Sequence, residues 1–248
     1  MVENNTPQEN IQPLDINSAF INLRRQQALS SFASFVRLIG NDRIIDKPQW
    51  DLVQFLQDFY DTDECEVAIV MAARGTLKTT TCSVLFPLWL LCKNPEERFL
   101  LDSNTSAQAM MRLSAIRLLI DNCDLLNLCF PGLIDPDYVD NASEFKIGTC
   151  KNPHQKEPSI ITGGIDKETT GAHCTWIIPD DCVTPLNKSG VAAQRAIDHF
   201  KFLMPLLDDV RKSGKRGKQL IVGTPYSVED AYNFVRGVMD DNKLKYMD

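Results

Sequence analysis

The chain has 248 residues, of which 44% are hydrophobic and 24% charged, values typical of a globular protein with one large core. Its formal net charge of −7 argues against a protein coated in nucleic acid, although a local basic patch is compatible with that total. The longest apolar run, Val84 to Cys92, is too short to cross a bilayer.

The N-terminal segment lacks the basic and apolar stretches of a signal peptide, so we expect a disordered leader there. Apolar residues then recur at helical spacing, which predicts a helix over 14–39 that ends at Gly40 and Asn41. A second helix is expected after Pro48. The expected organisation is a leader at 1–13, a helical N-terminal subdomain at 14–45 and a main domain at 46–248.

Strand-like and helix-like segments alternate from residue 67 onward. Strands are expected at 67–71, 98–101, 159–161, 175–178 and 219–222, and helices at 78–92, 104–120 and 191–207. This alternation predicts an α/β fold, with a mostly parallel central sheet and helices on its faces. Pro87 should kink the first of these helices because it lacks a backbone donor. Residues 131–158 are poorly periodic and are expected to form loops or a small excursion from the sheet.

Eight cysteines are scattered along the chain without a C-x-x-C pair, which favours a reducing environment and no disulfides. A zinc site built from Cys150, His154, His173 and Cys174 is conceivable, because four nitrogen and sulfur ligands suit zinc. Their spacing fits no zinc pattern, so buried thiols in apolar segments are the preferred interpretation.

The stretch VAIVMAARGTLKTTT, residues 67–81, combines an apolar strand, a short turn and a helix that opens at Lys78 and Thr79. This is the layout of a P-loop, in which backbone N–H groups surround phosphate oxygens, the Lys reaches the outer phosphates and the Thr binds Mg²⁺. In the pattern G-x-x-x-x-G-K-[ST], however, the glycine positions fall on Ala72 and Leu77. The alternative is a strand–turn–helix with an exposed Lys. The loop residues expected to contact a nucleotide are Ala73, Arg74, Gly75, Thr76, Leu77, Lys78, Thr79 and Thr80.

Two further strands end in polar residues. TWIIPDD, residues 175–181, ends in Asp180, assigned to the Mg²⁺ shell, and Asp181, assigned to the attacking water. Its alternative is a strand followed by an acidic turn, and Pro179 is unusual in a central strand. QLIVGTPYS, residues 219–227, ends in Gly223 and Thr224. Because ligands of parallel sheets bind beyond the carboxyl ends of the strands, we expect these groups to share one crevice with Lys78.

Five segments, in this order, resemble the large terminase subunit of tailed bacteriophages, the ATPase that pumps DNA into the capsid. They are PQWDLVQFLQ, AARGTLKTTT, WLLCKNPEERFLLDSNTSAQA, TTGAHCTWIIPDDCVTPLNKSG and IVGTPYSVEDAYN. The resemblance covers about residues 45–240 and is strongest to the terminases of short-tailed phages.

The resemblance implies a RecA-like, additional-strand P-loop ATPase that uses ATP and Mg²⁺ to move double-stranded DNA into the procapsid. It implies that Gln49 contacts adenine, that Gly223 and Thr224 couple hydrolysis to movement, and that Arg74 precedes the loop glycine. The implied partners are the portal protein, the small terminase subunit and further copies of the chain in a ring, in the cytoplasm of the host cell. The isolated chain is expected to be a monomer.

The chain departs from the family at two positions. Leu77 replaces the glycine before the Lys, and His173 stands where relatives often place an Arg upstream of the acidic pair. If that Arg is offered to a neighbouring subunit, another cation must replace it here. Arg74, acting within its own subunit, is the first candidate, and Arg112 and Arg117 are weaker ones, more simply explained as a solvated helix face. The nuclease domain of the family is not expected in these residues, so we expect no DNA cleavage.

The segment RKSGKRGK, residues 211–218, carries five basic side chains in eight positions. It is expected either to contact the DNA backbone or to form a solvated hairpin. Its basic residues are Arg211, Lys212, Lys215, Arg216 and Lys218. Two alternatives to a packaging motor remain at this point: a helicase-like P-loop ATPase, and a degenerate P-loop module that docks a partner without turnover.

Overall fold

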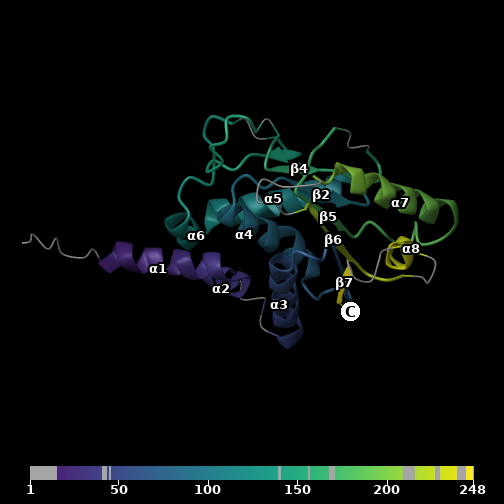
Figure 1. Ribbon diagram of the computed structural model, residues 1–248, viewed down its shortest axis with the longest axis horizontal. Coiled ribbons are helices and arrows are strands. Elements are labelled where there is room, and N and C mark those ends of the chain that lie inside the picture. The colour runs from purple at the N-terminus through teal and green to yellow at the C-terminus, as the bar shows by residue number, and fades with distance from the viewer. Residues whose placement is uncertain are drawn as a thin grey trace, which may run out of the picture.

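The computed structural model describes residues 16–40, 44, 46–138, 141–155, 157–167, 171–208, 216–226, 230–238 and 244–247. In this part of the chain seven strands form one sheet, which runs through the centre of the molecule (Figure 1). The strands are β1 (Val67–Met71), β2 (Phe99–Ser103), β3 (Glu144–Phe145), β4 (Ile160–Thr162), β5 (Trp176–Asp180), β6 (Lys218–Gly223) and β7 (Leu244–Met247). The predicted leader at 1–13 lies outside the described residues.

The sheet order is β3-β4-β2-β5-β6-β1-β7, and every neighbouring pair is parallel except β3 with β4. The predicted α/β fold with a mostly parallel sheet is therefore confirmed. The strand β6 lies between β1 and β5, so the strand before the loop and the strand before the acidic pair are not direct neighbours. All five residues of β1 are buried, as expected of a strand covered on both faces.

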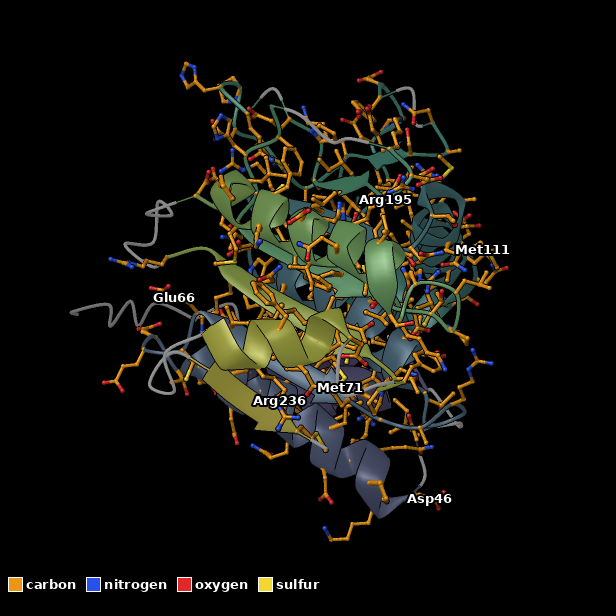
Figure 2. The ribbon with its side chains drawn as sticks, turned by 90° about the vertical axis from the view of Figure 1, so that its right-hand side faces the viewer. Asp46, Glu66, Met71, Met111, Arg195 and Arg236 are labelled. Atoms are coloured by element: carbon orange, nitrogen blue, oxygen red, sulfur yellow. The ribbon has the colours of Figure 1, made fainter. Side chains whose placement is uncertain are left out.

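Helices cover both faces of the sheet (Figures 1 and 2). The first face carries α1 (Ile16–Ser30), α2 (Phe32–Leu38), α3 (Lys47–Asp61), η1 (Thr80–Leu85), α4 (Phe86–Lys93), α5 (Ser106–Asn122) and α6 (Asp124–Cys129). The second face carries α7 (Gly190–Leu203), η2 (Met204–Leu206) and α8 (Ala231–Val238). Among the helices that the structure describes, none combines the length and apolar character needed to cross a membrane.

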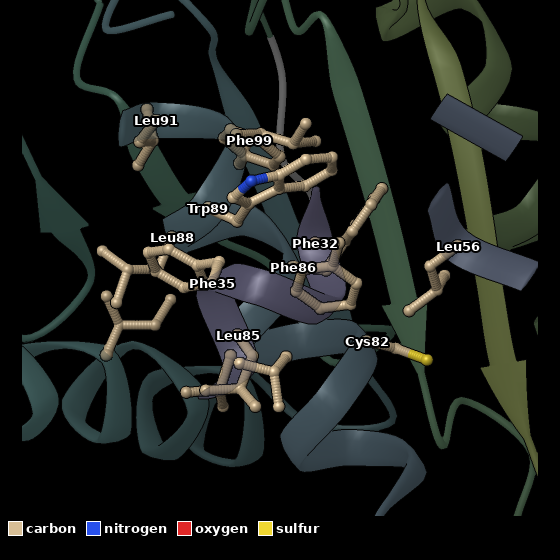
Figure 3. Close-up of a cluster of buried hydrophobic side chains, with 14 of the residues drawn as sticks. Phe32, Phe35, Leu56, Cys82, Leu85, Phe86, Leu88, Trp89, Leu91 and Phe99 are labelled. Carbon is tan, nitrogen blue, oxygen red and sulfur yellow. The ribbon is translucent and has the colours of Figure 1, made fainter. Parts of the chain in front are cut away.

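Successive strand residues belong to two separate cores, because side chains alternate between the two faces of a sheet. Val70 and Leu101 belong to the larger core, under α1 to α6, whereas Ile69 and Leu100 belong to the smaller core, under α7 and α8. Figure 3 shows the aromatic centre of the larger core. The period-two pattern of these strands thus accounts for the three-layer arrangement.

The predicted helix over 14–39 is interrupted at Ser31. Ser31 has extended backbone and its side chain accepts a hydrogen bond from Ser34 N–H, so it caps a new helix, α2. Phe32 then packs against Phe86 and Trp89, with ring centroids 5.4 and 5.2 Å away (Figure 3). The N-terminal helices therefore share the larger core with the sheet.

The helix after β1 begins at Lys78 and passes through a π-helical segment, η1, before continuing as α4. Phe86 N–H donates to Thr81 O, five residues back, instead of four. Pro87 comes directly after it, at the start of α4. Pro87 has no backbone N–H to donate to Ser83 O, and the widened turn accommodates it. The sequence had predicted a kink at this position.

The strands after β1 end later than predicted. The strand β2 reaches Ser103, β5 reaches Asp180, and the pairing of β5 with β6 passes over Ile178 and Pro179. Pro179 is thus tolerated inside a central strand where that ladder is interrupted. The strand β7, which was not predicted, extends the sheet beside β1.

Candidate phosphate-binding and catalytic site

The loop between β1 and the helix after it contains two residues with left-handed backbone. Gly75 has φ 86° and Leu77 has φ 61°, both in the left-handed region. A Cβ at Gly75 would meet nothing within 4 Å, so the backbone angle, not space, favours glycine there. Leu77 adopts the left-handed conformation at the position where the P-loop pattern has its second glycine. The substitution therefore leaves the turn in place and adds strain to it.

Lys78 opens the helix and points its ammonium group at the acidic pair. Its side chain is 6% exposed, and Nζ lies 3.9 Å from Asp181 Oδ1. Burial excludes the alternative of an exposed surface lysine. Asp181 itself is 38% exposed, has φ 53° and donates its N–H to Val222 O of β6. The structure therefore joins the loop and the strand end that the sequence assigned to one crevice.

Asp180 is buried and accepts three side-chain hydrogen bonds. Thr79 Oγ1 lies 3.3 Å from Oδ1, while Ser83 Oγ and Arg112 Nε lie 2.9 and 3.3 Å from Oδ2. Burial raises the pKa of this carboxyl above its ordinary value, and the nearby Arg112 guanidinium opposes the rise. The two residues assigned to Mg²⁺, Thr79 and Asp180, are therefore in direct contact.

The donor set suits magnesium, which takes a hydroxyl and a carboxylate oxygen readily when phosphate oxygens complete the shell. Thr79 and Asp180 are the residues that would hold the ion. Within the described residues no group of three or more His, Cys, Asp or Glu side chains could hold a metal, and the conceivable zinc cluster is not formed.

The end of β6 is fastened to the loop. Ala72 N–H donates to Gly223 O, and Thr224 Oγ1 lies 3.2 Å from Ala72 O. Arg74 extends to the same segment, where its Nη2 lies 2.8 Å from Tyr226 Oη. The two segments assigned to hydrolysis and coupling are therefore in direct contact.

A pocket of about 280 Å³ opens beside the loop. Its walls include Pro48 and Leu52 from α3, Thr76 from the loop and Met247 from β7. Its mostly apolar walls suit a flat aromatic ring. Gln49, predicted to contact adenine, lies between the two α3 residues in sequence, and its Oε1 accepts the Asp46 N–H at the start of α3.

Two arginines interpreted as a solvated helix face are engaged. Besides Asp180, Arg112 contacts Gln108 O through Nη1 at 2.6 Å. Arg117 Nη2 contacts Asn141 O and Glu144 O, at 2.7 and 2.5 Å. The solvated-face interpretation is therefore wrong for both, because each guanidinium is hydrogen-bonded to other groups of the chain.

The prediction that Lys218 contacts DNA is also wrong. Lys218 is 2% exposed, and its Nζ donates to Phe59 O and Thr62 O at the end of α3. Arg216 is exposed and forms an ion pair with Glu66 at 2.8 Å. The other basic residues of this segment, Arg211, Lys212 and Lys215, lie outside the described residues.

His173 lies before β5, at the end of that strand opposite to Asp181. Its ring is exposed, and Nδ1 is 4.0 Å from Asp208 Oδ1. The structure thus separates His173 from the loop after β1.

Sequence reasoning missed Ser83, Ser103 and Tyr226 at this site. Ser103 Oγ donates to Asp180 O at 2.7 Å, and the other two contact Asp180 and Arg74. Ser83 lies four residues after Thr79, a helical spacing that signals a shared face, although a lone serine in an apolar helix carries little information.

Comparison of the chain with protein-family models gives no match, and neither does comparison with curated proteins. The functional argument therefore rests on the motifs and on the geometry of the site.

Proposed function

We propose that this chain is an ATP-hydrolysing motor domain of a viral large terminase subunit, driving double-stranded DNA into a procapsid. One observation supports the ATPase part above all. Directly after the loop, the buried Lys78 lies beside Asp181, and Thr79 is hydrogen-bonded to Asp180. That arrangement matches what phosphoryl transfer requires, namely a phosphate cradle, a cation and a metal-binding carboxylate held in fixed positions.

Each residue has a separate task in this proposal. Lys78 neutralises charge on the outer phosphates, and Asp181, next to it, orients the attacking water. Thr79 and Asp180 hold Mg²⁺, which supplies charge neutralisation at the phosphates when bound. Arg74 stabilises the charge that develops as the phosphate bond breaks. The apolar pocket beside Thr76 receives the base, with α3 as its outer wall.

The packaging role is supported by the order of the five sequence segments, together with the contact between the loop and the Gly223–Thr224 strand end. A strand end bonded to the loop can sense the loss of a phosphate, because the hydrogen bond between Thr224 and Ala72 would pass a shift of the loop to β6. Under this proposal the partners are double-stranded DNA, the portal protein, the small terminase subunit and identical subunits in a ring, in the cytoplasm of the host cell.

Steady-state ATP hydrolysis, measured with and without double-stranded DNA, tests the proposal. Lys78→Ala should lower turnover by about 100-fold or more, because a preorganised charge at the phosphates is lost. Lys151→Ala, at an exposed lysine, is the matched control and should retain wild-type turnover.

Unchanged turnover in a folded Lys78→Ala variant would overturn the P-loop assignment. Nucleotide binding by the wild-type chain without turnover, also in the presence of DNA, would favour a docking module. DNA unwinding by the chain would instead favour a helicase-like ATPase.

A further inference from the structure

A second buried polar cluster lies behind the acidic pair, on the face covered by α7. Asp102, in β2, is fully buried beside Pro179 of β5. His199 Nε2, from α7, lies 2.7 Å from Asp102 Oδ2, and Cys182 Sγ lies 3.4 Å from the same oxygen. None of these three residues has a role in the site described above.

Packing alone does not explain this cluster. A buried carboxylate loses its hydration, and Asp102 Oδ1 has no hydrogen-bond partner among the described residues. An apolar side chain would suit the smaller core better. The Cys182 thiol donates a hydrogen bond to this carboxylate, with Sγ 3.4 Å from Asp102 Oδ2.

The cluster is connected to Asp181 by one covalent step. Cys182 comes directly after Asp181 in the chain, and Ser103, the neighbour of Asp102, donates to Asp180 O. Consecutive residues of β2 thus hold the residues before and after Asp181. With its own N–H bonded to Val222 O, Asp181 keeps a left-handed backbone that the surrounding contacts impose.

A second helix on this face, α8, contacts the turn formed by residues 180–183. Tyr232 of α8 lies with its Oη 3.2 Å from Val183 N, just after Cys182. Tyr232 of α8 therefore contacts the acidic turn directly, whereas His199 of α7 is connected to it through Asp102.

We propose that Asp102 and His199 are positioning residues that hold the Asp181 carboxylate at the orientation needed to direct water, with Cys182 as the link. This inference rests on the proposed function for its consequence in ATP hydrolysis. Its structural part, the fixing of residues 180–183, is independent of that function. Neither residue touches the nucleotide; each acts through the turn.

Hydrogen exchange measured by mass spectrometry on peptides covering residues 178–184 tests the fixing directly. His199→Ala removes the donor to Asp102, whereas the side-chain amide of His199→Gln restores one. Exchange at the Asp181 and Val183 amides should accelerate by about tenfold or more in His199→Ala, the factor that corresponds to losing a hydrogen bond to a charged group. His154→Ala, at an exposed histidine, is the control.

ATP kinetics on the same variants supply the functional readout. For His199→Ala we expect kcat to fall by about 100-fold, because a small displacement of a catalytic group is sufficient for that loss. Nucleotide affinity should stay within about twofold, since Lys78 and the loop are untouched. His199→Gln should stay near wild type, and Cys182→Ala should behave as His199→Ala does. Thermal melting of every variant separates a loosened turn from a lost fold.

Unchanged exchange at residues 181–183 in His199→Ala would overturn the inference. Equal losses of kcat and melting temperature in His199→Ala and His199→Gln would overturn it too, because they would indicate a general role in stability. A wild-type chain that binds nucleotide without turnover would overturn the proposed function alone, and the exchange comparison would still decide whether the cluster fixes the turn.

Discussion

Leu77 carries conformational strain in the loop after β1, because its φ of 61° lies in the left-handed region. A non-glycine residue in the left-handed region costs about 1–2 kcal/mol, and a β-branched residue fits it worse. Leu77→Gly should therefore preserve nucleotide affinity, with relief of strain offsetting lost packing, while Leu77→Val should be less stable than Leu77→Gly by about 1–2 kcal/mol. Urea unfolding and nucleotide titration measure both. Equal stability of the two variants would contradict the role of the backbone angle.

Asp180 and Arg112 make a pH-dependent contribution to stability. The pKa of Asp180 is raised by burial, so the folded state loses stability as pH rises through that pKa, from just above the ordinary carboxyl value of about 4. Arg112→Met removes the cation that limits this rise, which raises the pKa further. We expect Arg112→Met to lower the free energy of unfolding by about 3 kcal/mol at pH 8 and by much less near pH 4.5.

Urea unfolding at several pH values tests this prediction, and Arg195→Met, at an exposed arginine of α7 (Figure 2), is the control. The same loss at both pH values would show that Arg112 stabilises the fold through packing instead of charge.

Asp180 and Asp181 should have different functions, which substitutions can distinguish. Asp181→Asn is expected to leave nucleotide binding nearly intact while hydrolysis falls by about 100-fold or more, because a water-orienting base is lost. Asp180→Asn should also weaken binding that depends on Mg²⁺, since Asp180 contacts Thr79 and Asp181 does not. Nucleotide titrations with and without Mg²⁺ distinguish the two. Identical behaviour of the variants would show that the division of roles is wrong.

At the scale of the elements, Lys218 joins β6 to α3. Its ammonium group lies at the carbonyl end of α3, where a cation compensates both the free C=O groups and the helix dipole. Lys218→Met keeps the length of the side chain but leaves those carbonyls buried, so we expect a loss of about 2 kcal/mol. Arg216→Met, two residues earlier and exposed, should cost less than about 1 kcal/mol. Chemical denaturation of both variants checks this difference.

At the scale of the whole molecule, we expect the isolated chain to be mostly monomeric at micromolar concentration and to hydrolyse ATP slowly. A cation supplied by a neighbour contributes about 10³–10⁵ in rate in related chemistry, and an isolated subunit lacks that cation. Turnover per subunit should therefore rise with concentration, measured alongside light scattering. Fast turnover by a proven monomer would place every catalytic cation in its own subunit and favour Arg74.

The order and type of the main elements could be predicted, because buried parallel strands and amphipathic helices leave clear periodic patterns. The meeting of the loop after β1 with the acidic pair could be predicted from the motif and from strand-end geometry. The partners of Arg112 and Lys218 could not be predicted, since a basic residue has the same local pattern whether it is solvated or meets a buried oxygen from a distant element. The strand β7 was missed because its four residues are too few for a clear pattern, and its pairing with the distant β1 leaves no local signal.

The π-helical segment η1 determines the directions in which the side chains before and after it point. Each residue of an α-helix turns the side-chain direction by about 100°, and the widened turn between Thr80 and Leu85 rotates the later part of the helix by roughly that amount. The side chain of Ser83, within this turn, is directed at Asp180, and Phe86 and Trp89 after it are directed into the aromatic core. Deleting one residue from this turn would leave the composition of the helix almost unchanged, yet its two ends could no longer face their targets at the same time.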